Sequence, residues 1–158
     1  MAEHGPGLSR LAWSYVREPG DREDLLQEIA FAIWKALPQF RGESSERTFL
    51  FRIAHNRAIA FLGRRRLPTV DAREDALESA DAAPDPERTL SDEQEGQRLI
   101  VAIRQLPLAY AQVMTLALEG MSYADIADVL GITASNVGAR LTRARDLLRQ
   151  ALRNSDGR

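Results

Sequence analysis

Apolar residues recur every three or four positions in several segments of the chain, and Pro, Gly and polar clusters separate these segments. The segments cover residues 8–18, 22–37, 45–62, 92–106, 108–118 and 120–130, and a last one begins near residue 133. This spacing places the apolar side chains on one face of an α-helix, whereas a half-buried strand alternates apolar and polar residues. No segment alternates in that way, so the pattern predicts an all-α protein.

Pro and Gly residues mark where the first helices are expected to end. Pro19 and Gly20 are predicted to stop the first helix, because these residues interrupt regular structure most strongly. Asp21 is a predicted N-cap for a second helix over residues 22–37, since its carboxylate can accept a hydrogen bond from an unpaired backbone N–H. At the other end of the chain, the tail from Asn154 is expected to be frayed.

Residues 67–91 differ from the rest of the chain. They contain three prolines, several alanines and many carboxylates, and they show no sustained period apart from a possible transient helix over 72–79. A segment of this composition is predicted to be a flexible, self-repelling acidic linker. It divides the chain into two small helical domains, a three-helix domain over 7–66 and a four-helix domain over 92–154.

The segment from Gly120 to Arg145 predicts two helices joined by a tight turn. Gly131 suits the left-handed end of the first helix, and Thr133 suits the N-cap of the second. The apolar side of the second helix is formed by Val137, Leu141, Ala144 and Leu148. Its polar, basic side is formed by Asn136, Ala139, Arg140 and Arg143. An ordinary helical hairpin with a solvated basic face could show this pattern. The small Ala127, the Gly turn and the cap together favour a helix-turn-helix, whose second helix enters the DNA major groove.

The distribution of charge supports this interpretation better than the total does. The 158 residues carry a formal net charge of −2, which is unusual for a DNA-binding protein. Arginines cluster at residues 64–66 and 140–153, however, and the carboxylates concentrate between these clusters. Two basic domains joined by an acidic linker describe the chain better than its net charge.

Several classes of site and location are disfavoured by composition. The chain has no Cys, so a disulfide framework, a thiol nucleophile and a Cys-based zinc site are excluded. His4 and His55 are too few and too far apart for a convincing metal site, and no cofactor is expected. No run is apolar enough to span a bilayer, and the N-terminus lacks a signal-peptide pattern, so a soluble cytoplasmic protein is expected.

Several motifs, taken in order, resemble a known family. They are Asp24-Leu25-Leu26-Gln27-Glu28, Phe40-Arg41-Gly42-Glu43-Ser44-Ser45, Thr48–Asn56, Leu106-Pro107, Glu119–Tyr123 and Arg143-Ala144-Arg145. The chain resembles bacterial RNA polymerase sigma factors of the sigma-70 class, in the small two-domain extracytoplasmic-function (ECF) group. The likeness extends over about residues 8–152 apart from the linker. One helix-turn-helix alone would indicate much less than these motifs in the order of the family.

The resemblance implies that Asp24, Gln27 and Glu28 form the main contact with core RNA polymerase, on the clamp coiled coil of its largest subunit. Two carboxylates and an amide on one helix face suit a basic helical partner. Without the resemblance, a solvated acidic face would be the simpler interpretation. Acid–base catalysis is disfavoured, because no His, Cys or Lys is organised around the carboxylates.

The resemblance also implies that residues 40–45 and the helix after them open the DNA and read the −10 element. A base drawn out of the stack needs an aromatic face, which Phe49 or Phe51 could supply, although each could equally be a core residue. The phosphates would be bound by the polar and basic residues Arg41, Arg52, Asn56, Arg64, Arg65 and Arg66.

The last helix corresponds to the −35 reader of the family. Ser135 and Asn136 lie at its N-terminus, where unpaired N–H groups favour phosphate, and Asn136 could also read a base edge. Arg140 and Arg143 could bind guanine or phosphates. Arg145 lies on a different side, so an ion pair within the domain is an equal alternative.

The resemblance implies three partners: core RNA polymerase, through the clamp coiled coil and the flap region; promoter DNA; and an anti-sigma factor. The linker would be either a bare tether or an acidic segment that imitates nucleic acid inside the polymerase. Three rival functions are a dimeric helix-turn-helix regulator, a sigma-like decoy that binds only anti-sigma, and an enzyme. The chain has no obvious dimerisation segment and no room for the receiver domain that known decoys carry, so an initiation factor without catalytic activity of its own is favoured.

Overall fold

The computed structural model describes residues 3–65 and 91–157, and these residues form seven α-helices and no strand. The helices are α1 (Gly5–Tyr15), α2 (Pro19–Ala36), α3 (Glu46–Arg65), α4 (Ser91–Gln105), α5 (Leu108–Leu118), α6 (Tyr123–Leu130) and α7 (Ala134–Asp156). A short 3-10 turn, Leu37–Gln39, follows α2. The predicted all-α class is confirmed. The predicted linker lies outside the described residues except for its last residue, Ser91, which begins α4.

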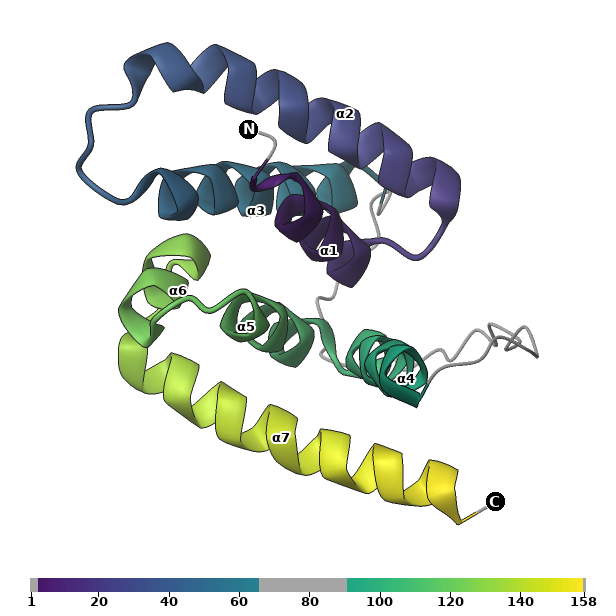
Figure 1. Ribbon diagram of the computed structural model, residues 1–158. Coiled ribbons are helices and arrows are strands. Elements are labelled where there is room, and N and C mark those ends of the chain that lie inside the picture. The colour runs from purple at the N-terminus through teal and green to yellow at the C-terminus, as the bar shows by residue number, and fades with distance from the viewer. Residues whose placement is uncertain (1–2, 66–90, 158) are drawn as a thin grey trace.

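The helices lie in layers, as Figure 1 shows. In the chosen view α2 is uppermost, α1 and α3 lie beneath it, α4 to α6 come next, and α7 lies at the bottom. Within this arrangement α1 packs on α5 and α3 packs on α6. The buried apolar residues of all these layers form one continuous core, which includes Leu11, Ile29, Phe51, Val113 and Leu141. The three N-terminal helices and the four C-terminal helices are therefore in direct contact.

The junction between α1 and α2 differs from the sequence-based expectation. The helix α1 ends at Tyr15, and Val16 is already extended, with φ −130° and ψ 137°. Pro19 and Gly20 begin α2 instead of stopping α1, because the first helical position tolerates a residue that has no N–H. Asp21 therefore lies in the first turn of α2, where it forms an ion pair with Arg65, and it is not the N-cap.

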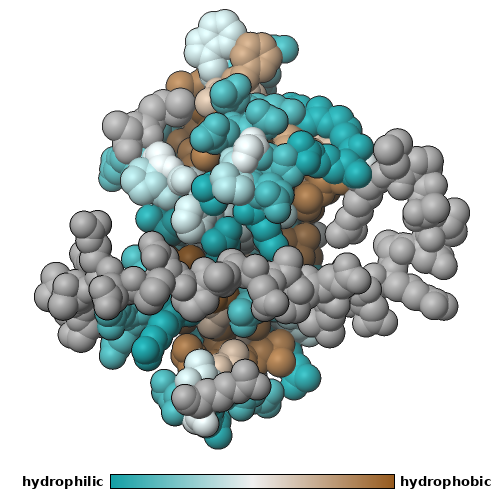
Figure 2. All heavy atoms as spheres, turned by 90° about the vertical axis from the view of Figure 1, so that its right-hand side faces the viewer, coloured by the Kyte–Doolittle hydropathy of each residue, from teal (hydrophilic) through white to brown (hydrophobic). Residues whose placement is uncertain are grey.

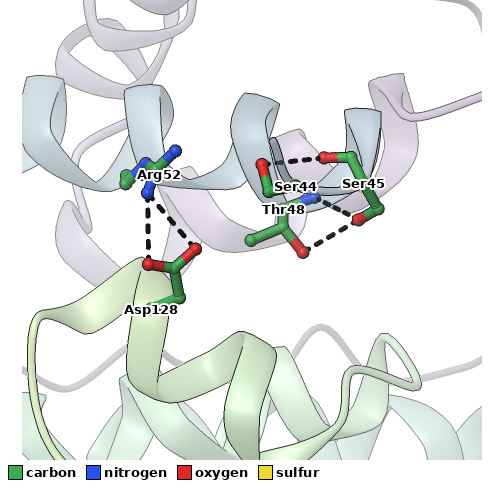
Figure 3. Close-up of polar contacts among 5 residues, drawn as sticks. All are labelled: Ser44, Ser45, Thr48, Arg52 and Asp128. Atoms are coloured by element: carbon green, nitrogen blue, oxygen red, sulfur yellow. Dashed lines mark hydrogen bonds and ion pairs between the residues drawn. The ribbon is translucent and has the colours of Figure 1, made fainter. Parts of the chain in front are cut away.

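The start of α3 is capped locally. The Ser45 hydroxyl accepts a hydrogen bond from the backbone N–H of Thr48 at 3.1 Å and donates one to the Thr48 hydroxyl at 2.9 Å (Figure 3). Thr48 is only 1% exposed, so this bond also satisfies a buried polar group. The expected start of the helix near Ser45 is confirmed.

The last helix is longer than expected. The helix α7 continues through Asn154 to Asp156, so the prediction of a tail frayed from Asn154 was wrong. The Ser155 hydroxyl donates to the carbonyl of Ala151, and Asp156 lies 3.8 Å from the guanidinium of Arg98 on α4. These contacts add to the helical bonds of the last turn.

Candidate nucleic-acid and partner interfaces

The turn between α6 and α7 has the geometry that the sequence predicts for a helix-turn-helix. Gly131 adopts the left-handed conformation, with φ 68°, and ends α6. The hydroxyl of Thr133 accepts the backbone N–H of Asn136 at 3.1 Å and caps α7. At the other end of α6, the Ser122 hydroxyl accepts the backbone N–H of Asp125. The end of α6 at Gly131 and the capped start of α7 at Thr133 together fix the turn between the two helices.

The outer face of α7 carries the residues predicted to read the −35 element. Val137, Leu141, Ala144 and Leu148 are buried, as the sequence predicts. Ser135, Asn136 and Arg143 are exposed, and Arg140 is half-buried with its Nε donating to the Asn136 side-chain oxygen at 3.0 Å. This bond orients both polar groups at the N-terminal end of the helix. Successive residues of a helix are turned by 100°, so Arg143 lies on the same side of α7 as Asn136 and Arg140. The exposed Arg145 lies on the opposite side.

The two phenylalanines on α3 have different environments. Phe51 is 1% exposed and belongs to the core, so this residue does not offer a stacking face to a base in this arrangement. Phe49 is half-buried, and its ring centroid lies 4.7 Å from that of Phe40, in the loop that precedes α3. Of the two candidates, Phe49 is the aromatic residue that a DNA base could reach.

The other polar candidates of the predicted −10 surface are accessible to different extents. Arg41 is exposed in the loop beside Gly42, which adopts a positive φ of 75°. Asn56 is exposed on α3. Arg52 is bound instead to Asp128 of α6, with Nη1 3.1 and 3.2 Å from the two carboxylate oxygens (Figure 3).

The basic end of α3 is also occupied by acidic partners. Arg64 forms an ion pair with Glu28, and Arg65 forms one with Asp21, both on α2. The two guanidinium groups also lie near the Phe61 ring, at 5.8 and 5.2 Å from its centroid. Arg66 lies outside the described residues. The first two arginines of the predicted DNA-binding cluster thus also hold the end of α3 against α2.

The predicted polymerase-binding residues share the outward face of α2. Leu25, Ile29 and Ile33 form the buried side of this helix. Asp24 and Gln27 are exposed on the opposite side, and Glu28 is half-buried at its edge because of the Arg64 contact. The structure thus places the three residues close together on one surface.

Two aromatic residues that the sequence analysis did not select continue this surface. Phe31 and Trp34 are 60% and 70% exposed, and their rings stack with centroids 6.0 Å apart. Figure 2 shows apolar and aromatic atoms protruding at the end of the molecule formed by α2. Large exposed apolar side chains on one helix face are typical of a protein-binding site. Their sequence signal is a pair of aromatics three residues apart, on the side opposite the buried stripe.

A polar cluster lies between the N-terminal and C-terminal helices. The Tyr15 hydroxyl of α1 contacts Nδ1 of His55 on α3 and is hydrogen-bonded by Gln112 of α5. Burial raises the pKa of Tyr15 far above its usual value, although the Gln112 bond acts in the opposite direction. Burial lowers the pKa of His55, because removal from water disfavours the imidazolium. Both groups are therefore kept neutral at the junction.

Across residues 3–65 and 91–157, His, Asp and Glu side chains form no group of three or more that could hold a metal ion. No helix in these ranges is both long and apolar enough to cross a bilayer.

The seven helices and the exposed basic face of α7 define a transcription factor of the helix-turn-helix class with an additional helical module. Residues 1–67 match the family described as Sigma-70 region 2, and residues 96–148 match Sigma-70, region 4. The chain belongs to the sigma-70 family of RNA polymerase sigma factors and is of the ECF type. It is therefore a transcription initiation factor.

Three similar proteins illustrate the relationship. The ECF RNA polymerase sigma-E factor of Escherichia coli (strain K12) is 36% identical over 138 residues, which cover 82% of this chain and 72% of that protein. A structure of CnrH in complex with the cytosolic domain of CnrY has a TM-score of 0.65 at 28% identity, covering 98% of this chain and 85% of the other. RpoE from Bartonella quintana, solved with the anti-sigma factor NepR, has a TM-score of 0.68 at 21% identity, covering 94% and 91%. The last comparison supports the fold alone.

Proposed function

We propose that three exposed surfaces of this ECF sigma factor divide the work of promoter recognition. The outward face of α2 binds core RNA polymerase through Asp24, Gln27 and Glu28. The loop before α3 and the outer side of that helix open and read the −10 element, with Phe49 as the stacking residue. The N-terminal half of α7 reads the −35 element through Ser135, Asn136, Arg140 and Arg143.

The observation that carries this proposal is the helix-turn-helix with its oriented polar end. The hydrogen bond from Arg140 to Asn136 joins a guanidinium and an amide on the exposed side of α7, next to the backbone N–H groups of the first turn. A guanidinium matches the two acceptors of guanine, whereas an amide matches the N7 acceptor and N6 donor of adenine or donates to a phosphate. The buried face of the same helix fixes the direction in which this pair points.

The surface on α2 supports the assignment of a protein partner beside the DNA. Carboxylates and an amide lie next to the exposed rings of Phe31 and Trp34, so the surface offers both charge and apolar area. Protein interfaces combine a central aromatic contact with a polar rim in this way. A basic helical element of the largest polymerase subunit fits that chemistry.

Four further aspects belong to the proposal. The chain itself performs no catalysis, since phosphodiester bond formation belongs to the polymerase. Residues 7–66 and 92–154 act as two domains joined by the acidic linker, and the protein works in the cytoplasm. An anti-sigma factor controls it, and the 28%-identical CnrH, solved in complex with the cytosolic domain of CnrY, supports a protein partner of this kind.

Reconstitution with core polymerase tests the proposal. The pure protein is mixed with core polymerase, and co-elution and promoter-specific transcripts are measured. A sigma factor is expected to co-elute and to direct transcripts from defined start sites. Binding of the isolated protein to an operator as a dimer, without co-elution, would indicate an autonomous regulator and would contradict the proposal.

A further inference from the structure

Three arginines from separate parts of the chain gather beside Trp13 of α1. The guanidinium carbon of Arg22, near the start of α2, lies 4.2 Å from the centroid of the Trp13 ring, and that of Arg104 on α4 lies 4.5 Å from it. Arg17, just after the end of α1, donates a hydrogen bond from Nη2 to the backbone oxygen of Arg104 at 3.3 Å. Arg17, Arg22 and Arg104 thus form one group, the arginine cluster.

The positive charge of the arginine cluster is not balanced as it is elsewhere. Within residues 3–65 and 91–157, no carboxylate forms an ion pair with Arg22 or Arg104. Arginines that join helices elsewhere pair with carboxylates, as do Arg10, Arg47, Arg52, Arg64 and Arg65. The cluster therefore has a charge that an added anion would neutralise.

The cations of the cluster also disfavour one another. Burial lowers the pKa of Arg104, and the charges of Arg22 and Arg17 lower it further. The acidic residues nearest in the sequence are Glu18, Asp21 and Glu23. Asp21 is bound to Arg65, and the other two are exposed, where water screens their charge. Repulsion among the three guanidinium groups therefore persists in the free protein.

The arrangement suits one compact anion that carries more than one negative charge. Arg22 and Arg104 contact the same ring, so their guanidinium carbons are no farther apart than the sum of their two distances to its centroid. A guanidinium presents parallel N–H donors that match the oxygens of a phosphate in pairs. A peptide carboxylate brings one charge, whereas a diphosphate brings at least two on neighbouring groups.

Trp13 contributes by holding two of the guanidinium groups. A guanidinium over an indole is attracted to the ring and is therefore restrained in position. Trp13, Arg22 and Arg104 are all half-buried, so none of these side chains moves as freely as an exposed arginine. Less side-chain entropy is then lost when an anion binds.

We propose that the arginine cluster is a binding site for a small anion with a diphosphate group. Inorganic pyrophosphate and the diphosphate of a nucleotide share this chemistry. Residues two apart on a helix are turned by about 200°, so Arg22 lies on the side of α2 opposite to Asp24 and the proposed polymerase surface. The site is thus separate from the three surfaces of the proposed function and does not depend on them.

Trp13 can report on the site directly. The chain has two tryptophans, and Trp34 is 70% exposed on α2, so Trp34→Phe leaves Trp13 as the only tryptophan. Inorganic pyrophosphate is added to this full-length protein at constant ionic strength without divalent cations. The Trp13 emission is expected to change in a saturable way, with half-saturation below about 1 mM. A change that does not saturate, or no change, would overturn the proposal.

Removal of the charges beside the ring tests which residues bind. Arg22→Gln with Arg104→Gln, in the Trp34→Phe protein, is expected to weaken pyrophosphate binding at least about tenfold. Arg17→Gln changes an exposed side chain, so this variant is expected to keep the thermal stability of the free protein and to weaken binding several-fold. Unchanged affinity in either variant would overturn the proposal.

The matched control removes two positive charges away from the cluster. Arg98→Gln with Arg149→Gln changes exposed residues of α4 and α7 and gives the same net charge as the double variant. Its affinity for pyrophosphate is expected to stay within about twofold. An equal loss in this control would assign the effect to net charge and would overturn the proposal.

Thermal denaturation separates a binding site from a purely structural contact of Trp13. Pyrophosphate is expected to raise the Tm of the unsubstituted protein, because a ligand that binds only the folded state stabilises it. The rise is expected to disappear in the Arg22→Gln, Arg104→Gln protein. If the substitutions lower the Tm of the free protein and pyrophosphate has no effect on either, the arginines have only a packing role and the proposal is overturned.

A comparison of probes identifies the source of the anion. A nucleoside diphosphate that binds more tightly than pyrophosphate would assign the site to a nucleotide, and equal affinities would assign it to the free diphosphate. Both results support the proposal. Sulfate, a polyglutamate peptide and a short single-stranded DNA are the competing probes. Tighter binding of any of these, lost in the Arg22→Gln, Arg104→Gln protein, would overturn it.

Discussion

Glu28 of α2 and Arg64 of α3 form an ion pair in which one guanidinium nitrogen lies 2.6 and 2.7 Å from the two carboxylate oxygens. Glu28 belongs to the proposed polymerase surface, and Arg64 belongs to the proposed DNA surface. The two proposed surfaces therefore meet at this pair, in which the Arg64 guanidinium neutralises the Glu28 carboxylate. Partial exposure of both side chains makes the pair weak enough to exchange partners.

Reversing the charge of the α2 face is expected to weaken polymerase binding. Asp24→Arg with Glu28→Arg places two guanidinium groups where a basic partner helix would dock, so co-elution with core polymerase should decrease at least about tenfold. Glu95→Arg with Asp146→Arg gives the same change in net charge elsewhere and should co-elute normally. Circular dichroism should show an intact fold, and unchanged co-elution of the first variant would contradict the assignment.

The exposed aromatic pair on α2 is expected to contribute to binding and little to stability. Phe31→Ser with Trp34→Ser should reduce polymerase affinity, while the free energy of unfolding changes by about 0.5 kcal/mol or less, as at other exposed sites. Ile33→Ala, between them, is the contrast. Ile33 is 1% exposed, so its truncation should cost about 2–5 kcal/mol in urea denaturation. A large stability loss in the aromatic variant would show that these rings have a structural role.

The basic flank of α7 is expected to control −35-dependent transcription. Arg140→Ala with Arg143→Ala removes two guanidinium groups on the Asn136 side of the helix, and transcript levels should fall. The salt dependence of DNA binding should become shallower by about one logarithmic unit for each phosphate that is no longer bound. Arg149→Ala with Arg153→Ala removes equal charge from later turns and should have a smaller effect. Equal losses in both variants would point to general electrostatic attraction.

Two glycines of the helix-turn-helix should respond to alanine in opposite directions. Gly138 lies within α7, where a Cβ would lie 3.5 Å from the Tyr123 ring, an ordinary contact. Gly138→Ala should therefore stabilise the fold by up to about 1 kcal/mol, because alanine favours helix. Gly131 has φ 68°, so Gly131→Ala should destabilise by about 1–2 kcal/mol. Thermal denaturation measures both, and a loss of stability in Gly138→Ala would show that the contact is too close.

Stability is expected to fall on mild acidification because of His55. Burial lowers the pKa of His55 in the folded state, so the unfolded chain binds more protons below its ordinary pKa of about 6.5. The stability that neutral His55 contributes is therefore complete above pH about 6.5. It decreases as the pH falls below this value, and the decrease stops below the pKa of His55 in the folded state. Urea denaturation over this range should show the decrease, and His55→Gln should flatten it. A slope that survives in the variant would assign the effect to other groups.

Local features of the sequence predicted the helix-turn-helix well. Gly131, Thr133 and the apolar side of α7 depend on backbone conformation and spacing within a few residues, and each is found as expected. The boundary at Pro19 was misplaced because proline both stops a helix and starts one, and only packing decides which.

Contacts between distant segments could not be derived from spacing. Arg52 and Asp128 are 76 residues apart, and their pairing depends on how α6 meets α3. The burial of Phe51 similarly depends on contact with α1, so helical period alone left it equivalent to Phe49. The exposure of Trp34 was missed because apolar residues are first expected in the core, whereas a partner surface needs them outside.

Gly7 of α1 lies where a Cβ atom would be 2.7 Å from a carboxylate oxygen of Glu119 and 2.9 Å from the Phe51 ring. Any replacement there would push against Glu119 and Phe51 at once and would act as a wedge, while every residue proposed to touch promoter or polymerase stayed in place. One substitution at this position would therefore loosen the contact of α1 with its neighbours while leaving the recognition chemistry unchanged.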